Sequence, residues 1–128
     1  MIYYKDNLYI DIRYKEEVMS NIDKTLLSGS MGTMLLKLLS EKDMYGYEMI
    51  ETLRVRSQNV FELKAGTLYP ILHAFEAKNY LTSYERDGMG KGRKYYSITH
   101  EGRKYLKSKM NEWETYSEAV AKVLAFGV

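Results

Sequence analysis

One pair of β-type segments interrupts a chain whose other apolar residues are spaced for helices. Residues 80–86 and 93–99 are rich in Tyr, Thr, Ser and Ile, side chains that favour strands. Between them lies Asp87-Gly88-Met89-Gly90-Lys91-Gly92, which predicts a hairpin with a flexible, glycine-rich tip. Few architectures place a single hairpin late in a helical chain of this size.

Three helical periods precede the hairpin, over residues 26–39, 44–56 and 65–78. The first carries apolar residues at spacings of four, three and four, which predicts one buried face. We expect Asp43 and Thr67 to be the N-caps of the second and third helices. The order helix, helix, helix, hairpin, helix predicts a mainly α protein with a small β hairpin (α+β), a winged helix-turn-helix.

The last helix, which Thr99 is expected to cap, has a longer apolar seam than one small domain can bury. Its seam residues recur at the spacing of a coiled coil. They are Leu106, Met110, Trp113, Ser117, Val120 and Leu124. A two-fold dimer would bury this seam and place two third helices about one DNA turn apart, roughly 34 Å.

Positive charge is concentrated in the middle of the chain. Residues 64–109 hold ten basic and four acidic side chains, a net +6, although the whole chain is only +2. Residues 1–63 and 110–128 are each net −2. A local basic face of this kind suits a polyanion better than a small substrate, and with the winged order it indicates double-stranded DNA.

The candidate DNA contacts lie on the third helix, on the wing and at the start of the second helix. Helix N-termini and cations bind phosphate, and polar side chains off the apolar stripe can reach phosphates or base edges. The tyrosine at the start of the second helix suits phosphate contact and packing equally. The candidates are Tyr45, Lys64, Thr67, Tyr69, Lys91, Arg93 and Lys94.

Trp113 is the only tryptophan and lies in the middle of the seam of the last helix. It is either part of a dimer core or a ligand contact. Two such rings across a dyad, with flexible methionines beside them, would form an adaptable slot for a planar hydrophobic effector. The expected lining residues of this slot are Trp113, Met110, Met31 and Met34.

Composition argues against catalysis and metal binding. The chain has no Cys and two His residues that lie 27 positions apart, and no nucleophile or carboxylate pair stands out. We therefore expect no enzyme activity, no cofactor and no metal. No stretch approaches the ~18 apolar residues of a membrane span, and the first residues lack the apolar region of a signal peptide. We expect a cytoplasmic protein.

Three blocks of sequence resemble the PadR-type transcriptional regulators, in the short form with a single C-terminal helix. They are YGYEMI at 45–50, GTLYPIL at 66–72 and GRKYYSITHEG at 92–102. The resemblance covers about residues 26–126. It implies a dimeric winged-helix repressor that contacts DNA through its third helix and wing and is released by a ligand. The alternative is a winged-helix adaptor that binds proteins without specific DNA binding.

These patterns divide the chain into three parts. We expect an N-terminal extension over residues 1–25, outside the main fold, and a winged-helix DNA-binding domain over residues 26–100. We expect a dimerisation helix over residues 101–128.

Overall fold

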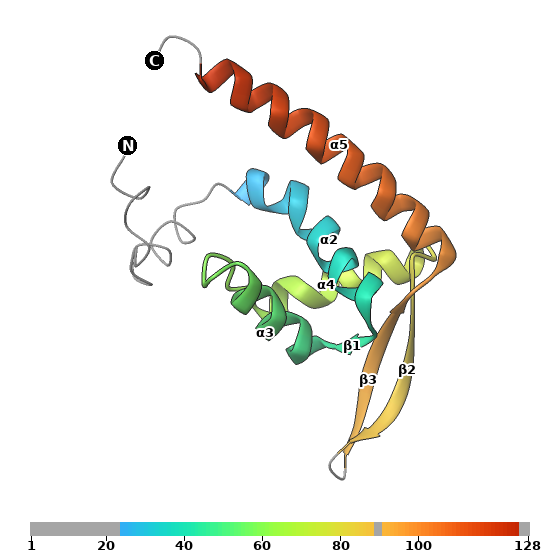
Figure 1. Cartoon of the computed structure of the whole chain (residues 1–128). Helices are drawn as coiled ribbons and strands as arrows, with labels where there is room; N and C mark the ends of the chain where they lie inside the picture. Colours follow the sequence, from blue (N-terminus) through green and yellow to red (C-terminus); the bar gives the residue numbers. More distant parts are fainter. Residues whose placement is uncertain (1–23, 89–90, 126–128) are drawn as a thin grey trace.

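A computed structural model describes residues 24–88 and 91–125, so the predicted extension over residues 1–25 lies almost wholly outside the described part (Figure 1). The mainly helical winged helix-turn-helix is confirmed. The elements are α2 (Lys24–Glu41), β1 (Met44–Tyr45), α3 (Gly46–Arg56), α4 (Ala65–Ala77), β2 (Leu81–Gly88), β3 (Lys91–Ile98) and α5 (His100–Ala125).

The sheet has three antiparallel strands in the order β1-β3-β2, and its short strand β1 was not predicted. Met44 pairs with Tyr96 and Tyr45 with Tyr95, so α3 begins at Gly46 rather than at Met44. The expected cap at Asp43 is also wrong, because no side chain caps α3. The Asp43 carboxylate instead accepts a 2.6 Å hydrogen bond from the Tyr84 hydroxyl and joins β2 to the segment before α3.

The wing is longer and its connection shorter than the sequence indicated. Strands β2 and β3 continue through Asp87 paired with Gly92 and Gly88 paired with Lys91. The six-residue tip is therefore wrong, because glycine lacks a side chain but keeps the N–H and C=O groups that a strand ladder needs. Residues 89–90, which connect the strands, lie outside the described residues. Figure 1 shows the wing extending away from the helices.

The hydrophobic core lies where α2, α3 and α4 meet the sheet. Tyr96 on the central strand is almost fully buried, and this burial raises the pKa of its hydroxyl. Its neighbours in the core come from every helix, because each helix turns one apolar stripe inward. The most completely buried side chains around it include Leu35, Leu36, Leu39, Met49, Leu68 and Leu72.

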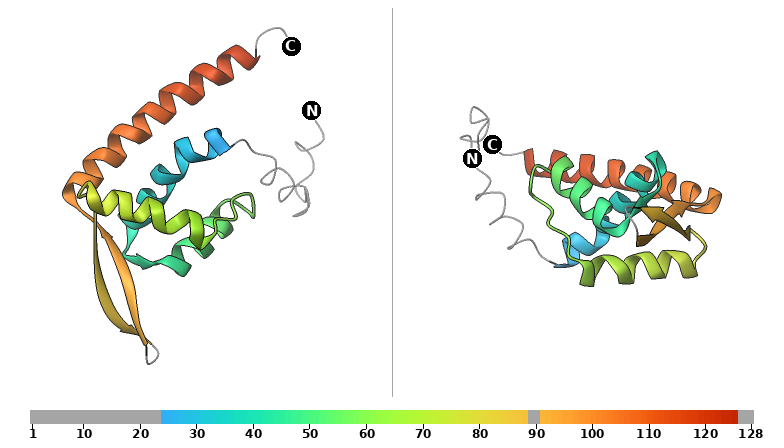
Figure 2. Two further views of the ribbon diagram at one scale, coloured as in Figure 1. Left: turned by 180° about the vertical axis from the view of Figure 1, so that it is seen from behind. Right: turned by 90° about the horizontal axis from the view of Figure 1, so that it is seen from below.

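Helix α5 packs tightly against the fold only at its beginning. Thr99 caps it as predicted, since the Gly102 N–H donates a 2.9 Å hydrogen bond to the Thr99 hydroxyl oxygen. Gly102 is buried so closely that a Cβ there would overlap the backbone carbonyl of Tyr80. Leu106 is the last buried residue of the helix, and beyond it α5 extends past the other elements (Figures 1 and 2).

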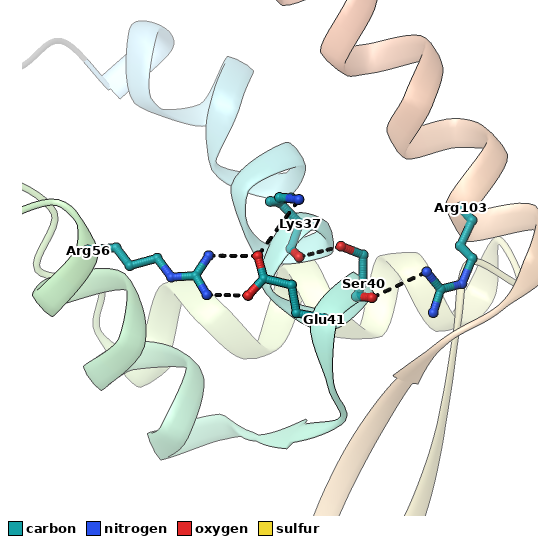
Figure 3. A network of polar contacts seen from close by, with 5 residues as sticks. All are labelled: Lys37, Ser40, Glu41, Arg56 and Arg103. Atoms are coloured by element: carbon teal, nitrogen blue, oxygen red, sulfur yellow. Dashed lines mark hydrogen bonds and ion pairs between the residues drawn. The ribbon is translucent and has the colours of Figure 1, made fainter.

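A polar network at the C-terminal end of α2 joins three helices (Figure 3). Arg56 of α3 donates two hydrogen bonds to the Glu41 carboxylate, and Lys37 forms a further ion pair with it at 3.7 Å. From α5, Arg103 donates a 3.3 Å hydrogen bond to the Ser40 carbonyl. The last carbonyl groups of a helix lack intrahelical partners, and Arg103 supplies a donor to one of them. Arg56 and Lys37 supply positive charge to the carboxylate at the same helix end.

Candidate nucleic-acid interface

A concave surface of about 430 Å³ lies where the start of α3, α4 and β3 meet. Four of the seven predicted DNA contacts share it, although they come from three separate segments of the chain. Two residues that sequence reasoning did not assign complete its lining. The residues that line this surface are Tyr45, Gly46, Tyr47, Tyr69, Arg93 and Lys94.

Tyr69 crosses from α4 to the first residue of α3. A Cβ built on Gly46 would overlap the Tyr69 hydroxyl, so the absence of a side chain at Gly46 makes room for this ring. Tyr69 remains 38% exposed, and its ring lies 6.3 Å from that of His73, one turn further along α4. The exposed face of α4 therefore presents the polar rings of Tyr69 and His73. Both side chains can contact phosphates or base edges.

The wing contributes cations that rest on aromatic rings. The Arg93 guanidinium carbon lies 4.4 Å from the Tyr45 ring centre, and Tyr45 packs edge-on against Tyr95 at 5.4 Å. On the neighbouring strand, Arg86 lies 5.2 Å from the Tyr95 ring centre. A guanidinium stacked on a ring keeps its N–H groups in its own plane, where they can donate to phosphate oxygens. Tyr45 thus serves packing within the fold and borders the candidate interface.

Lys64 and Thr67 lie on the other side of α4 from Tyr69. Thr67 is not the N-cap, because α4 begins at Ala65 after Lys64 in an extended conformation, and no side chain caps it. The Thr67 N–H instead donates a 2.9 Å hydrogen bond to the Lys64 carbonyl within the first turn. Residues two apart on a helix point in nearly opposite directions. The predicted set is therefore divided between two surfaces.

Lys91, the remaining predicted contact, begins β3 and pairs with Gly88 across the wing, but its side chain lies outside the described part of the structure. Tyr47 is the clearest residue that sequence reasoning missed, since it is 64% exposed beside this surface. Its position in the sequence could have indicated this exposure, because Tyr47 follows Gly46 and lies outside the apolar stripe of α3.

A second and larger depression, about 880 Å³, lies between α2, α4 and α5. We call it the α2–α4–α5 groove. Its lining includes Met31, Lys64, Thr67, Phe75 and Tyr105. Among the four predicted ligand-binding residues only Met31 lines it. Met34 packs partly buried against the core, whereas Met110 and Trp113 lie further along α5. The described chain alone does not bring these four residues to one site.

The exposure of the residues of the predicted α5 seam varies along the helix. Leu106 belongs to the core of this chain, whereas Met110, Trp113 and Leu124 are 43%, 54% and 72% exposed. Ser117 and Val120 are half-buried. Two further large side chains, Tyr116 and Val123, are also exposed on the same helix.

The described part of the structure contains no cluster of three or more potential metal ligands. Within the same residues, no helix combines the length and apolar character needed to cross a membrane.

Comparison with known families gives one match by sequence model. The family described as "Transcriptional regulator PadR-like family" matches residues 35–108, which include α3, α4 and the wing. Among curated proteins, "Uncharacterized protein X" of Lysinibacillus sphaericus is 35% identical over 96 residues, which are 74% of this chain and 88% of that protein. "Transcriptional regulator YqjI" of Escherichia coli K12 is 26% identical over 92 residues, 72% of this chain but 43% of its own length.

Solved structures resemble the chain over most of its length. A transcriptional regulator from Clostridium thermocellum superposes with a TM-score of 0.73 at 36% identity, covering 77% of this chain and 97% of the other. A PadR family transcription regulator from Clostridium difficile R20291 gives a TM-score of 0.65 at 35% identity, covering 75% of this chain and 99% of the other.

Proposed function

Because the chain belongs to the PadR-like family of transcriptional regulators, we propose that it acts as a dimeric repressor whose release from DNA is controlled by a small hydrophobic ligand. The observation that carries the DNA-binding part is the surface shared by Tyr69 of α4 and by Arg93 and Lys94 of the wing. A helix for the major groove and cations for the backbone lie side by side there, as duplex recognition requires.

The two surfaces of α4 have different roles in DNA binding. Tyr69, supported by Gly46, faces the wing and reads the groove. Lys64 and Thr67 mark the N-terminal end of α4, whose backbone N–H groups attract phosphate. Arg93, Lys94 and Lys91 of the wing contact the flanking backbone. These contacts set affinity and make it depend on salt, whereas Tyr69 and its neighbours on α4 supply preference for sequence.

Dimerisation uses the part of α5 that lies beyond Leu106. Its large exposed apolar side chains, Trp113 and Leu124 among them, form a surface that a second copy would cover. A two-fold pair would present two α4 helices to a two-fold operator. Residues 101–128 then act as the dimerisation helix, although the first turns of α5 also complete the core of the winged domain.

The α2–α4–α5 groove is the site we assign to the effector. Its apolar floor includes Met31, Ile71 and Phe75, and its volume of about 880 Å³ lies in the range of small-molecule sites. Thr67 and Pro70 of α4 are part of its wall, so an occupant would bear directly on the DNA-binding helix. In the dimer, Trp113 and Met110 would extend the same apolar surface toward a planar ligand.

Transcription in vitro from the promoter of the chain's own gene tests the repressor role. Added protein should reduce transcript, and a panel of planar hydrophobic compounds should contain at least one that restores it. Activation by the protein would contradict repression. A stable complex with another protein through α5, together with DNA binding no tighter than to random sequence, would favour the adaptor function instead.

A further inference from the structure

The α2–α4–α5 groove has a mainly apolar lining. Ile71 and Phe75 of α4, Met31 of α2 and Tyr105 of α5 are among the residues that line it. The rim is charged, with Lys64 and Lys109 opposed by Glu62. Apolar surface left in water is unfavourable by about 25 cal/mol for each Å², so a segment able to cover this groove would be held there.

The chain itself supplies such a segment at one end of the groove. Residues 1–23 lead directly into α2 at Lys24, and Gly29 and Gly32 of α2 line the groove. The rise of an α-helix, about 1.5 Å per residue, puts Gly29 roughly 7.5 Å from Lys24. Gly29 also leaves open space where a side chain would project.

The sequence of this segment alternates in the manner of a chain with one apolar edge. Leu8, Ile10 and Ile12 lie on one edge and Asp11 and Arg13 on the other, and the two tyrosines at positions 9 and 14 fall on opposite edges. A period of two is typical of a half-buried extended segment. Seven such residues would span about 23 Å. The ten residues from Tyr14 to Lys24 reach at most about 35 Å, and the groove lining begins on α2 itself, at Gly29.

Charge favours the same pairing. Residues 1–23 hold five acidic and three basic side chains, a net −2. The groove lining contains two cations, Lys64 and Lys109, and one anion, Glu62, and Lys109 is also paired at 3.4 Å with Glu112 of α5. Residues 64–109, which supply both cations and most of the groove, carry a net +6. Residues 8–14 are themselves neutral, with Asp11 and Arg13, and the acidic excess lies in residues 15–23, which follow them. The apolar edge of residues 8–14 therefore matches the floor of the groove, and the acidic tether matches the cations at its rim.

We propose that residues 8–14 bind in the α2–α4–α5 groove of their own chain as a tethered ligand. A short tether holds its ligand at an effective concentration of the order of mM, so a weak intrinsic affinity is sufficient for occupancy. The docking itself requires no DNA. One consequence rests on the proposed function: a free effector must displace this segment, which raises the effector concentration needed for release.

Cross-linking in the full-length chain tests the docking, because the sequence contains no cysteine to interfere. Ile12→Cys is combined with Ala74→Cys, which lies on the groove wall. Two controls each change one member of the pair. Asp11→Cys moves the thiol to the polar edge of the segment. Ala77→Cys moves it to another exposed residue of α4, outside the groove lining. A short bis-maleimide joins the two thiols only when they lie close together.

The Ile12→Cys/Ala74→Cys pair should cross-link within one chain about tenfold faster than either control pair, because docking raises the local concentration above that of a freely moving tether. Equal rates in all pairs would overturn the proposal. So would products that are covalent dimers, since the segment would then fill a partner's groove. The assay uses neither DNA nor effector, so its failure is distinguishable from a failure of the proposed DNA binding.

Discussion

The Tyr69 hydroxyl occupies the space in which a side chain at Gly46 would lie. Helix α4 can therefore pack Tyr69 against the start of α3 because Gly46 has no Cβ. The atom that a new Cβ would meet is the far end of a mobile side chain. Gly46→Ala should therefore displace the Tyr69 ring rather than unfold the protein.

We predict that Gly46→Ala weakens DNA binding about tenfold while the free energy of unfolding changes by less than about 1 kcal/mol. Tyr69→Ala should have a similar effect on affinity, and Gly46→Ala/Tyr69→Ala should be no worse than Tyr69→Ala alone, because the two substitutions remove one shared contact. Anisotropy titrations and urea melts of the four proteins complete the cycle. Additive losses of affinity would show that Gly46 acts independently of Tyr69.

Gly102 presents the opposite case, because a Cβ there would meet the backbone carbonyl of Tyr80 and the side chain of Ile98. Backbone cannot move aside, so Gly102→Ala should lower the free energy of unfolding by about 1–3 kcal/mol. Gly29→Ala is the matched control in a helix with open space. It should raise stability by about 0.5–1 kcal/mol. Urea denaturation at one fixed protein concentration checks both, and equal stability of the two variants would contradict the packing of α5.

The wing cations should govern the salt dependence of DNA binding. Arg93→Gln/Lys94→Gln removes two cations from the interface, and the slope of log affinity against log salt should fall by about 2. Lys104→Gln/Lys107→Gln removes the same charge from exposed positions on α5. If that control variant reduces the slope as much as the wing variant, the wing has no specific part in binding.

The apolar surface of α5 should hold two chains together. Val120→Asp places a charge on the seam and should weaken the dimer at least about tenfold, whereas Ala121→Asp, an exposed neighbour off the seam, should leave it intact. Sedimentation measures the dissociation. Trp113 provides a second readout, since its emission should shift to the red as dilution exposes the ring. A wild-type chain that is monomeric at all concentrations would refute this assignment.

Acid should weaken the network at the end of α2. The hydrogen bonds from Arg56 lower the pKa of Glu41 below the 4.5 of a free carboxyl group. The Arg56–Glu41 pair therefore contributes its full stabilisation at pH values above the pKa of a free carboxyl group. This contribution is lost as the pH falls through the lowered pKa of Glu41. Arg56→Gln should make the stability less dependent on pH between 7 and about 3.

Arg103→Gln is the control for this pH dependence, because Arg103 donates to the Ser40 carbonyl, which does not titrate. Its stability should decline in acid as steeply as that of the wild type. Thermal melts across the pH range measure both variants. An unchanged acid decline in Arg56→Gln would mean that the Glu41 ion pair contributes nothing in solution.

The order of elements was predictable because helical and strand periods are local properties of the sequence. Strand β1 was missed since Met44 and Tyr45 are too few to show a period, and their pairing with Tyr95 and Tyr96 depends on residues some fifty positions away. The length of the wing was underestimated because Gly92 resembles a loop residue in sequence but pairs in the ladder with Asp87.

The candidate site was only partly predictable. Sequence reasoning counted both Thr67 and Tyr69 as DNA contacts because both lie outside the apolar stripe of the third helix. The structure separates them, since two residues of helix turn a side chain by more than half a circle. The contact between Tyr69 and Gly46 depends on how two helices cross, and so does the exposure of Tyr47 beside it. Neither has a signature in local sequence.

The surface around Tyr69, Arg93 and Lys94 should bind a specific duplex. Fluorescence anisotropy of a labelled fragment from upstream of the chain's own gene, titrated with excess random DNA at several salt concentrations, tests it most directly. We predict tight binding that survives the competitor and falls steeply as salt increases. Binding to this fragment and to other candidate operators that is no tighter than to random DNA would mean that this surface does not recognise a specific duplex.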